Sequence, residues 1–156
     1  MTEQYLAAIS LIERLHRHFL NVVKLELDSS EIRDTNNVQA TILFNIGDAE
    51  MTVGELTLRG CYLGSNVSYN LKKLVENGYV EQARSSHDRR SAHVRLTQKG
   101  RALRDRLAAM HRRHAESLQC VITAPDLEHA AATLSRLERF WVRVGDKAPS
   151  FSRLVA

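Results

Sequence analysis

The chain has few cysteines and no long apolar run, the features that hold small secreted domains together and that let a helix cross a membrane. It contains 156 residues but only two cysteines, Cys61 and Cys120, which are far apart and form no CxxC pair. We therefore expect free thiols in a reducing compartment rather than a disulfide framework. No apolar run approaches the roughly 18 residues of a membrane span, and no basic and apolar leader opens the chain. The sequence predicts a cytoplasmic protein without a membrane partner.

The sequence also lacks the motifs that catalysis requires. It has no Walker loop, no GxGxxG after a predicted strand and no nucleophile elbow. His111 and His114 are spaced like two ligands on one helix face, but a closed zinc site needs about four ligands. We expect these histidines to be partly buried interface residues. We expect neither an enzyme nor a bound metal or cofactor.

What is present instead is a concentration of positive charge. Residues 59–106 hold eleven Lys or Arg against four Asp or Glu, a net charge of +7, whereas the rest of the chain carries −3. The formal total of +4 therefore conceals one strongly basic segment between two mildly acidic arms. Such localised charge is typical of a surface that binds phosphates.

The spacing of apolar residues predicts a mainly α-helical chain with a small two-stranded β-wing, an α+β fold. Four helices, two strands and two further helices follow one another, which is the order of a winged helix-turn-helix head between long terminal helices. We interpret 1–156 as a single domain. Its DNA-binding lobe is expected at 36–100, and helical dimerisation regions are expected at 1–35 and 101–156. The expected helices cover 4–27, 36–46, a short segment after Thr52, 65–76, 97–120 and 126–144, and the expected strands cover 79–84 and 93–96.

Local signals place several of the helix ends. Thr52 and Glu55 form a capping box at a helix start, and Thr123 and Asp126 form a second one. Gly78 follows the helix at 65–76 and predicts a left-handed stop there. The central helices and the wing are therefore bounded by residues with a physical reason to stand at those positions.

The helix at 65–76 is the expected recognition helix. Its apolar stripe, Val67, Leu71 and Leu74, predicts that the opposite face is exposed. A major groove accepts one α-helix; asparagine pairs with adenine, lysine reaches guanine or phosphate, and hydroxyl groups serve either. The alternative is a solvated helix face without a ligand. The expected DNA-contacting residues are Ser65, Asn66, Ser68, Tyr69, Lys72 and Lys73.

The loop between the two expected strands supplies a second contact. It contains His87, Asp88, Arg89 and Arg90 at a hairpin tip. Arginine suits a narrow minor groove, where negative potential is concentrated. Asp88 is placed to orient the Arg90 guanidinium by an ion pair. The alternative is an exposed turn with a weak salt bridge.

These segments resemble the MarR family of bacterial winged-helix regulators. The matching residues run from Leu74 through Gly78-Tyr-Val-Glu81 to Asp88-Arg-Arg90 and Leu96-Thr-Gln-Lys-Gly100. The resemblance implies that 65–76 is the recognition helix, that Arg90 enters the minor groove and that the terminal helices make a homodimer. The segment RGCYLGSNVSYNLKKLVENGY is also similar to the LdtR-type branch, which is linked to cell-envelope stress.

A sequence-specific regulator on a pseudo-palindromic duplex, most often a repressor, is the function that this resemblance implies. The family often senses small molecules, so we expect a small aromatic or anionic effector that releases the DNA. Candidate effector-binding residues are His16, Phe19, Arg59 and Cys61, which mix apolar walls with cations.

Two other functions stay open. Cys61 stands beside Arg59 at the start of a helix, an environment that lowers a thiol pKa, so a redox-sensing regulator is one alternative. A protein-interaction module that keeps the winged fold without binding DNA is the other, although the basic segment disfavours it.

Overall fold

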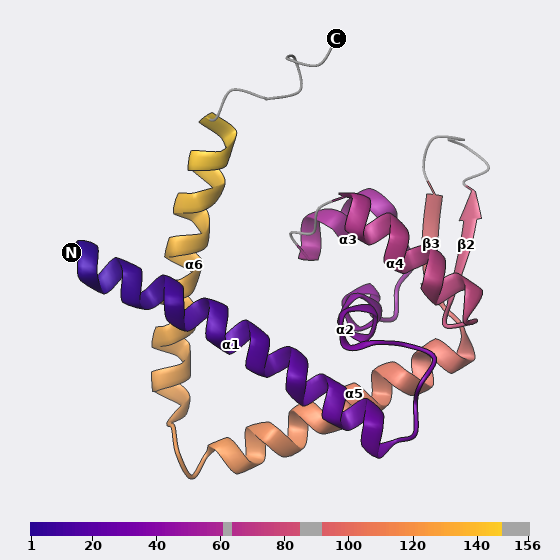
Figure 1. Cartoon of the computed structure of the whole chain (residues 1–156), viewed down its shortest axis with the longest axis horizontal. Helices are drawn as coiled ribbons and strands as arrows, with labels where there is room; N and C mark the ends of the chain where they lie inside the picture. The colour runs from indigo at the N-terminus through magenta and orange to yellow at the C-terminus, as the bar shows by residue number, and fades with distance from the viewer. Residues whose placement is uncertain (61–63, 85–91, 148–156) are drawn as a thin grey trace. The chain divides into compact units, whose positions relative to one another are not determined.

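The computed structural model describes residues 1–60, 64–84 and 92–147, and it divides into two compact units, Met1–His111 and Arg112–Ala156. The elements are labelled in Figure 1. None of the helices within the described residues is both long and apolar enough to cross a membrane. The elements in chain order are α1 (Thr2–Ser29), α2 (Asn37–Ile46), β1 (Met51–Thr52), α3 (Val53–Gly60), α4 (Gly64–Glu76), β2 (Val80–Arg84), β3 (Ala92–Leu96), α5 (Gln98–Leu118) and α6 (Ala124–Lys147).

Helix α2 lies in the middle of the first unit, as Figure 1 shows. Asn36 caps it: its side chain accepts a hydrogen bond from the Gln39 amide at 2.9 Å, and Gln39 accepts one from the Asn36 amide at 3.2 Å. The helix ends at Gly47, which has a φ of 70°. The buried side chains of α2 include Ile42 and Leu43, and these join the core of the unit.

The sheet contains one strand more than the sequence predicts. Strand β1 pairs antiparallel with β3, with Met51 opposite Val94, and the strand order is β1-β3-β2. The short strand stands directly before the predicted capping box, which is confirmed: the Glu55 amide donates to Thr52 Oγ1 at 3.1 Å and the Thr52 amide donates to Glu55 at 2.7 Å. Strand β1 therefore adds a third strand to the two-stranded wing. Thr52 both ends this strand and caps α3. The predicted mainly helical fold class is confirmed.

Helix α1 exposes many of its apolar side chains. Val23 and Leu27 are its buried residues, and they pack in the core near its C-terminal end. Towards the N-terminus, Leu6 is 60% exposed and Leu15 is 53% exposed. Apolar side chains that face water contribute little to the stability of the fold.

The second unit contains the end of α5 and the whole of α6. The predicted second capping box is confirmed, because the Asp126 amide donates to Thr123 Oγ1 at 3.3 Å and Thr123 Oγ1 donates to Asp126 at 2.5 Å. Helix α6 leaves a row of apolar side chains exposed at a spacing of seven or three residues, among them Leu127, Leu134, Trp141 and Val144.

A close approach near the start of α5 constrains Gly100. A Cβ added there would collide with the carbonyl oxygen of Tyr79. Replacing Gly100 with alanine should lower the free energy of unfolding by about 1–3 kcal/mol, because the backbone must move to accept the methyl group. Chemical denaturation followed by circular dichroism measures the change.

Gly54 provides the matched control in the same unit. A Cβ there meets only Thr52 Oγ1 at 3.8 Å, an ordinary contact. Gly54→Ala should be neutral or slightly stabilising, since alanine loses less backbone entropy on folding. Equal stability of the two variants would contradict the close packing of α5 on the Tyr79 backbone.

Candidate nucleic-acid interface

One face of α4 is anchored in the core. Val67 and Leu74 are completely buried, and Leu71 is nearly so. One buried residue on this side, Asn70, is polar. Its side-chain amide donates to the carbonyl of Asn66 one turn earlier, at 2.8 Å. Burial of this stripe fixes the rotation of α4 about its own axis, and it matches the stripe that the sequence predicts.

The opposite face of α4 is polar and exposed. Asn66, Ser68, Tyr69 and Lys72 all lie on it, and Tyr69 is 62% exposed. Ser65 lies in the first turn of the helix. Side chains of these types on one helix face are chemically suited to base edges and phosphates.

The two lysines of α4 differ in their surroundings. Lys73 donates to Glu76 at 2.7 Å, and this hydrogen bond raises the pKa of Lys73 and lowers the pKa of Glu76. Lys72 is 3.9 Å from the other oxygen of Glu76, and its side chain is 76% exposed. Lys72 therefore has the ammonium that can reach a ligand without losing a close partner.

An ion pair joins the two long strands of the wing. Glu81 on β2 stands directly opposite Arg95 on β3, and the guanidinium donates to the carboxylate at 2.7 and 2.9 Å. The hydrogen bond to Glu81 raises the pKa of Arg95. The expected wing residues His87, Asp88, Arg89 and Arg90 lie outside the described residues.

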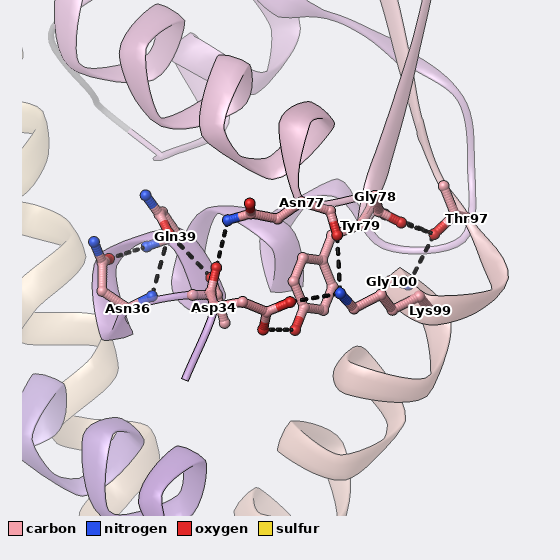
Figure 2. A network of polar contacts seen from close by, with 10 residues as sticks. Asp34, Asn36, Gln39, Asn77, Gly78, Tyr79, Thr97, Lys99 and Gly100 are labelled. Carbon is pink, nitrogen blue, oxygen red and sulfur yellow. Dashed lines mark hydrogen bonds and ion pairs between the residues drawn. The ribbon is translucent and has the colours of Figure 1, made fainter. Parts of the chain in front are cut away.

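The C-terminal end of α4 is tied to two other segments through Asp34, in the connection between α1 and α2. Its carboxylate accepts hydrogen bonds from the Tyr79 hydroxyl and from Lys99 Nζ, each at 2.5 Å. Its backbone carbonyl accepts a hydrogen bond from the Asn77 side chain. Figure 2 shows the carboxylate between the phenol and the ammonium. We call Asp34, Asn77, Tyr79 and Lys99 the Asp34 junction.

The junction is closed on the side of α5. Lys99 also donates to the carbonyl of Asn77 at 2.9 Å, and its ammonium lies 4.2 Å from the centre of the Tyr79 ring. Thr97 Oγ1 donates to the carbonyl of Gly78 at 2.7 Å and accepts from the Gly100 amide at 3.1 Å, which makes it the cap of α5 as predicted. The segment between α4 and β2 is thus bonded to the cap and the first turn of α5.

Electrostatics keep the junction in one protonation state. Burial raises the pKa of the Asp34 carboxyl, but the hydrogen bonds from Lys99 and Tyr79 outweigh it, so this pKa lies below its ordinary value. Burial and the hydrogen bond to Asp34 raise the pKa of the Tyr79 phenol. At neutral pH the carboxylate is therefore charged and the phenol is a donor.

The expected effector residues have different surroundings. Phe19 stacks on His111 with the ring centres 5.9 Å apart, and Phe44 meets the same imidazole edge-on at 5.1 Å. Arg59 donates to the carbonyl of Asn45 at 3.1 Å and so caps the end of α2. His16 is exposed on α1, and Cys61 lies outside the described residues.

No cluster of three His, Cys, Asp or Glu side chains that could hold a metal ion occurs within 1–60, 64–84 and 92–147. Cys120 is an exposed free thiol.

Sequence reasoning missed Asp34 and the role of Arg59. Lys99 and Gly100 stand in the motif that carries the family resemblance. That motif indicated the start of α5, but it did not indicate which residues Lys99 and Gly100 contact. Asp34 has no such signal, because its partners are 43 to 65 residues away in the chain.

The arrangement of α3, α4 and the β2–β3 hairpin is that of a winged helix-turn-helix protein. A model of the winged helix DNA-binding domain matches residues 36–100. The exopolysaccharide II synthesis transcriptional activator ExpG of Rhizobium meliloti (strain 1021) is 39% identical over 142 residues, which cover 88% of this chain and 71% of that protein.

Two solved structures share the fold. FabT of Streptococcus pneumoniae, in complex with DNA, has a TM-score of 0.72 at 22% identity and covers 90% of this chain and 99% of its own. A mutant of MarR from E. coli, complexed with operator DNA, has a TM-score of 0.71 at 19% identity and covers 88% of this chain and 97% of its own.

The chain belongs to the MarR family of winged-helix transcriptional regulators. The resemblance predicted from the sequence is thereby confirmed. The narrower similarity to the LdtR-type branch stays a prediction.

The two lysines of α4 give a test of which side chains meet the ligand. Lys72→Ala should weaken duplex binding and reduce the log–log salt slope by about 1, because one phosphate contact is lost. Lys73→Ala, its matched neighbour, should have a smaller effect since its ammonium is already bonded to Glu76. Fluorescence anisotropy at several salt concentrations measures both. A larger loss for Lys73→Ala would show that the Lys73–Glu76 pair opens on DNA.

Proposed function

We propose that this protein is a dimeric, sequence-specific DNA-binding regulator that places α4 in the major groove and the tip of the β2–β3 hairpin in the adjacent minor groove. The observation that carries the proposal is the exposed polar face of α4, which has a fixed rotation and lies within a segment of net charge +7. Such a regulator meets its DNA in the cytoplasm.

Each part of this surface suits a different part of a duplex. Asn66, Ser68 and Tyr69 offer groups that distinguish base edges, and Lys72 offers an ammonium for phosphate. Arg89 and Arg90 stand in the sequence between β2 and β3, and arginine suits the negative potential of a narrow minor groove. Base choice is therefore assigned to α4 and much of the salt-dependent affinity to the wing and the lysines.

Exposed apolar stripes support a homodimer. Leu127, Leu134 and Trp141 repeat at seven-residue intervals along α6, the spacing with which helices pack against one another. Helix α1 also exposes apolar side chains, among them Tyr5, Leu15 and Phe19. A second copy of the chain would cover these side chains, and a two-fold dimer matches a pseudo-palindromic operator.

Regulation by a small aromatic or anionic molecule is part of the proposal. The partly exposed Phe19, stacked on His111, offers an aromatic wall, and His16 lies on the same helix. Arg59 contributes only if it leaves the carbonyl of Asn45. Oxidation of Cys61 is the alternative trigger. A response to peroxide that Cys61→Ser abolishes, with no response to aromatic carboxylates, would favour it.

The direction of regulation separates two candidate functions. Repression is the function that the sequence resemblance implies, whereas the relative at 39% identity is named an activator. Transcription in vitro from a promoter carrying the selected operator distinguishes them, because purified protein lowers transcript levels in one case and raises them in the other.

The wing arginines provide the test of DNA binding. Arg90→Ala should weaken operator binding by about 1–3 kcal/mol, the scale of a good arginine contact. Arg89→Ala is the matched control and should cost less if Arg89 faces solvent or phosphate. Titrations at several salt concentrations on a duplex obtained by selection from random DNA measure both. A folded Arg90→Ala protein that binds the operator like the parent would contradict the assignment of Arg90 to the minor groove. Weak, salt-insensitive binding of the parent to every duplex would favour a protein-interaction module instead of a DNA-binding regulator.

A further inference from the structure

The Asp34 junction joins three segments at the C-terminal end of the recognition helix α4. Asn77 and Tyr79 directly follow α4, Asp34 lies between α1 and α2, and Lys99 lies in the first turn of α5. The connection between α1 and α2 and the first turn of α5 therefore meet the segment after α4 within one set of hydrogen bonds. None of the four residues lies on the exposed face of α4 that carries Asn66 and Tyr69.

The contacts of the junction are specific rather than general packing. Tyr79 is 3% exposed, and a buried hydroxyl requires a partner, which the Asp34 carboxylate supplies at 2.5 Å. The same carboxylate holds Lys99 at 2.5 Å, so one charge fixes a residue after α4 and a residue of α5 at once. Removal of that charge leaves the core stripe of α4 in place, and it leaves the direct bonds of Lys99 and Thr97 to the carbonyls of Asn77 and Gly78. It removes the anion that holds the Tyr79 hydroxyl and the Lys99 ammonium together.

We propose that Asp34 is a positioning residue for operator recognition, which sets the angle between α4 and the helices α1 and α5 and thereby the separation of the two recognition helices in the dimer. This inference rests on the proposed function as a dimeric DNA-binding regulator. Asp34 acts through Tyr79 and Lys99 and does not touch DNA. Its loss should therefore change which spacing of half-sites is preferred, and should leave the binding of a single half-site nearly unchanged.

The experiment uses the full-length chain and a set of duplexes. The duplexes carry two copies of the selected half-site, separated by spacers that grow by one base pair, together with a single half-site. The variants are Asp34→Asn, which keeps the shape of the side chain but removes its charge, and Lys99→Met, which removes the partner. Asp48→Asn is the matched control, since it removes the charge of another carboxylate that pairs with α5, through Arg104.

The parent should prefer one spacer. Asp34→Asn and Lys99→Met should bind that spacer about tenfold more weakly, the scale of a lost hydrogen bond to a charged group. They should also show a flatter dependence on spacer length, and should bind the single half-site within about twofold of the parent. Asp48→Asn should keep the spacing preference of the parent. A folded Asp34→Asn protein with the parental spacing profile would overturn the inference, and so would an equal loss on the single half-site and the full operator.

Two further measurements keep these outcomes distinct. Circular dichroism establishes that each variant is folded. If Asp34→Asn does not fold, Tyr79→Phe, which loses only the hydroxyl, takes its place and should flatten the same profile. A parent protein that is monomeric by light scattering, or that binds all spacers equally, would contradict the proposed dimeric function itself. A parent with a sharp preference that the variants share would contradict only the role of Asp34.

Discussion

Burial of one face of α4 is the constraint on which the rest of the structure depends. Val67, Leu71 and Leu74 are withdrawn from water into the core that α2 occupies, and this leaves no freedom for the helix to rotate. The opposite face must then be exposed, whatever its residues are. Polar contacts do not create this arrangement, but they refine it: the pairs on the surface of α4 decide which lysine is available, and the Asp34 junction holds the end of the helix.

Most of the fold was predictable because its signals are local. A capping box is encoded in four residues, so the starts of α3 and α6 followed from Thr52 with Glu55 and from Thr123 with Asp126. Gly78, with a φ of 74°, ended α4 as expected. Strand β1 was missed, because two residues carry no alternation, and because Met51 and Thr52 pair with a strand more than 40 residues away. Helix α1 extends beyond the expected range at both ends, since its exposed apolar residues do not mark a boundary.

The candidate site was predictable to the extent that it follows helical periodicity. The exposure of Asn66, Ser68 and Tyr69 follows from the buried stripe alone. The difference between Lys72 and Lys73 depends on which of them Glu76 contacts more closely, and spacing alone does not decide that. Asp34 was beyond sequence reasoning, because its role comes from partners that only the folded chain brings to it.

The most direct test of the account is a hydroxyl-radical footprint of the full-length protein on its selected operator. Two recognition helices held by one dimer should protect two patches on the same face of the duplex, with centres about one turn, or roughly 10 base pairs, apart. Symmetric patches at that separation are the predicted result. A single patch, or uniform protection along the duplex, would contradict the claim that the two α4 helices act as a pair.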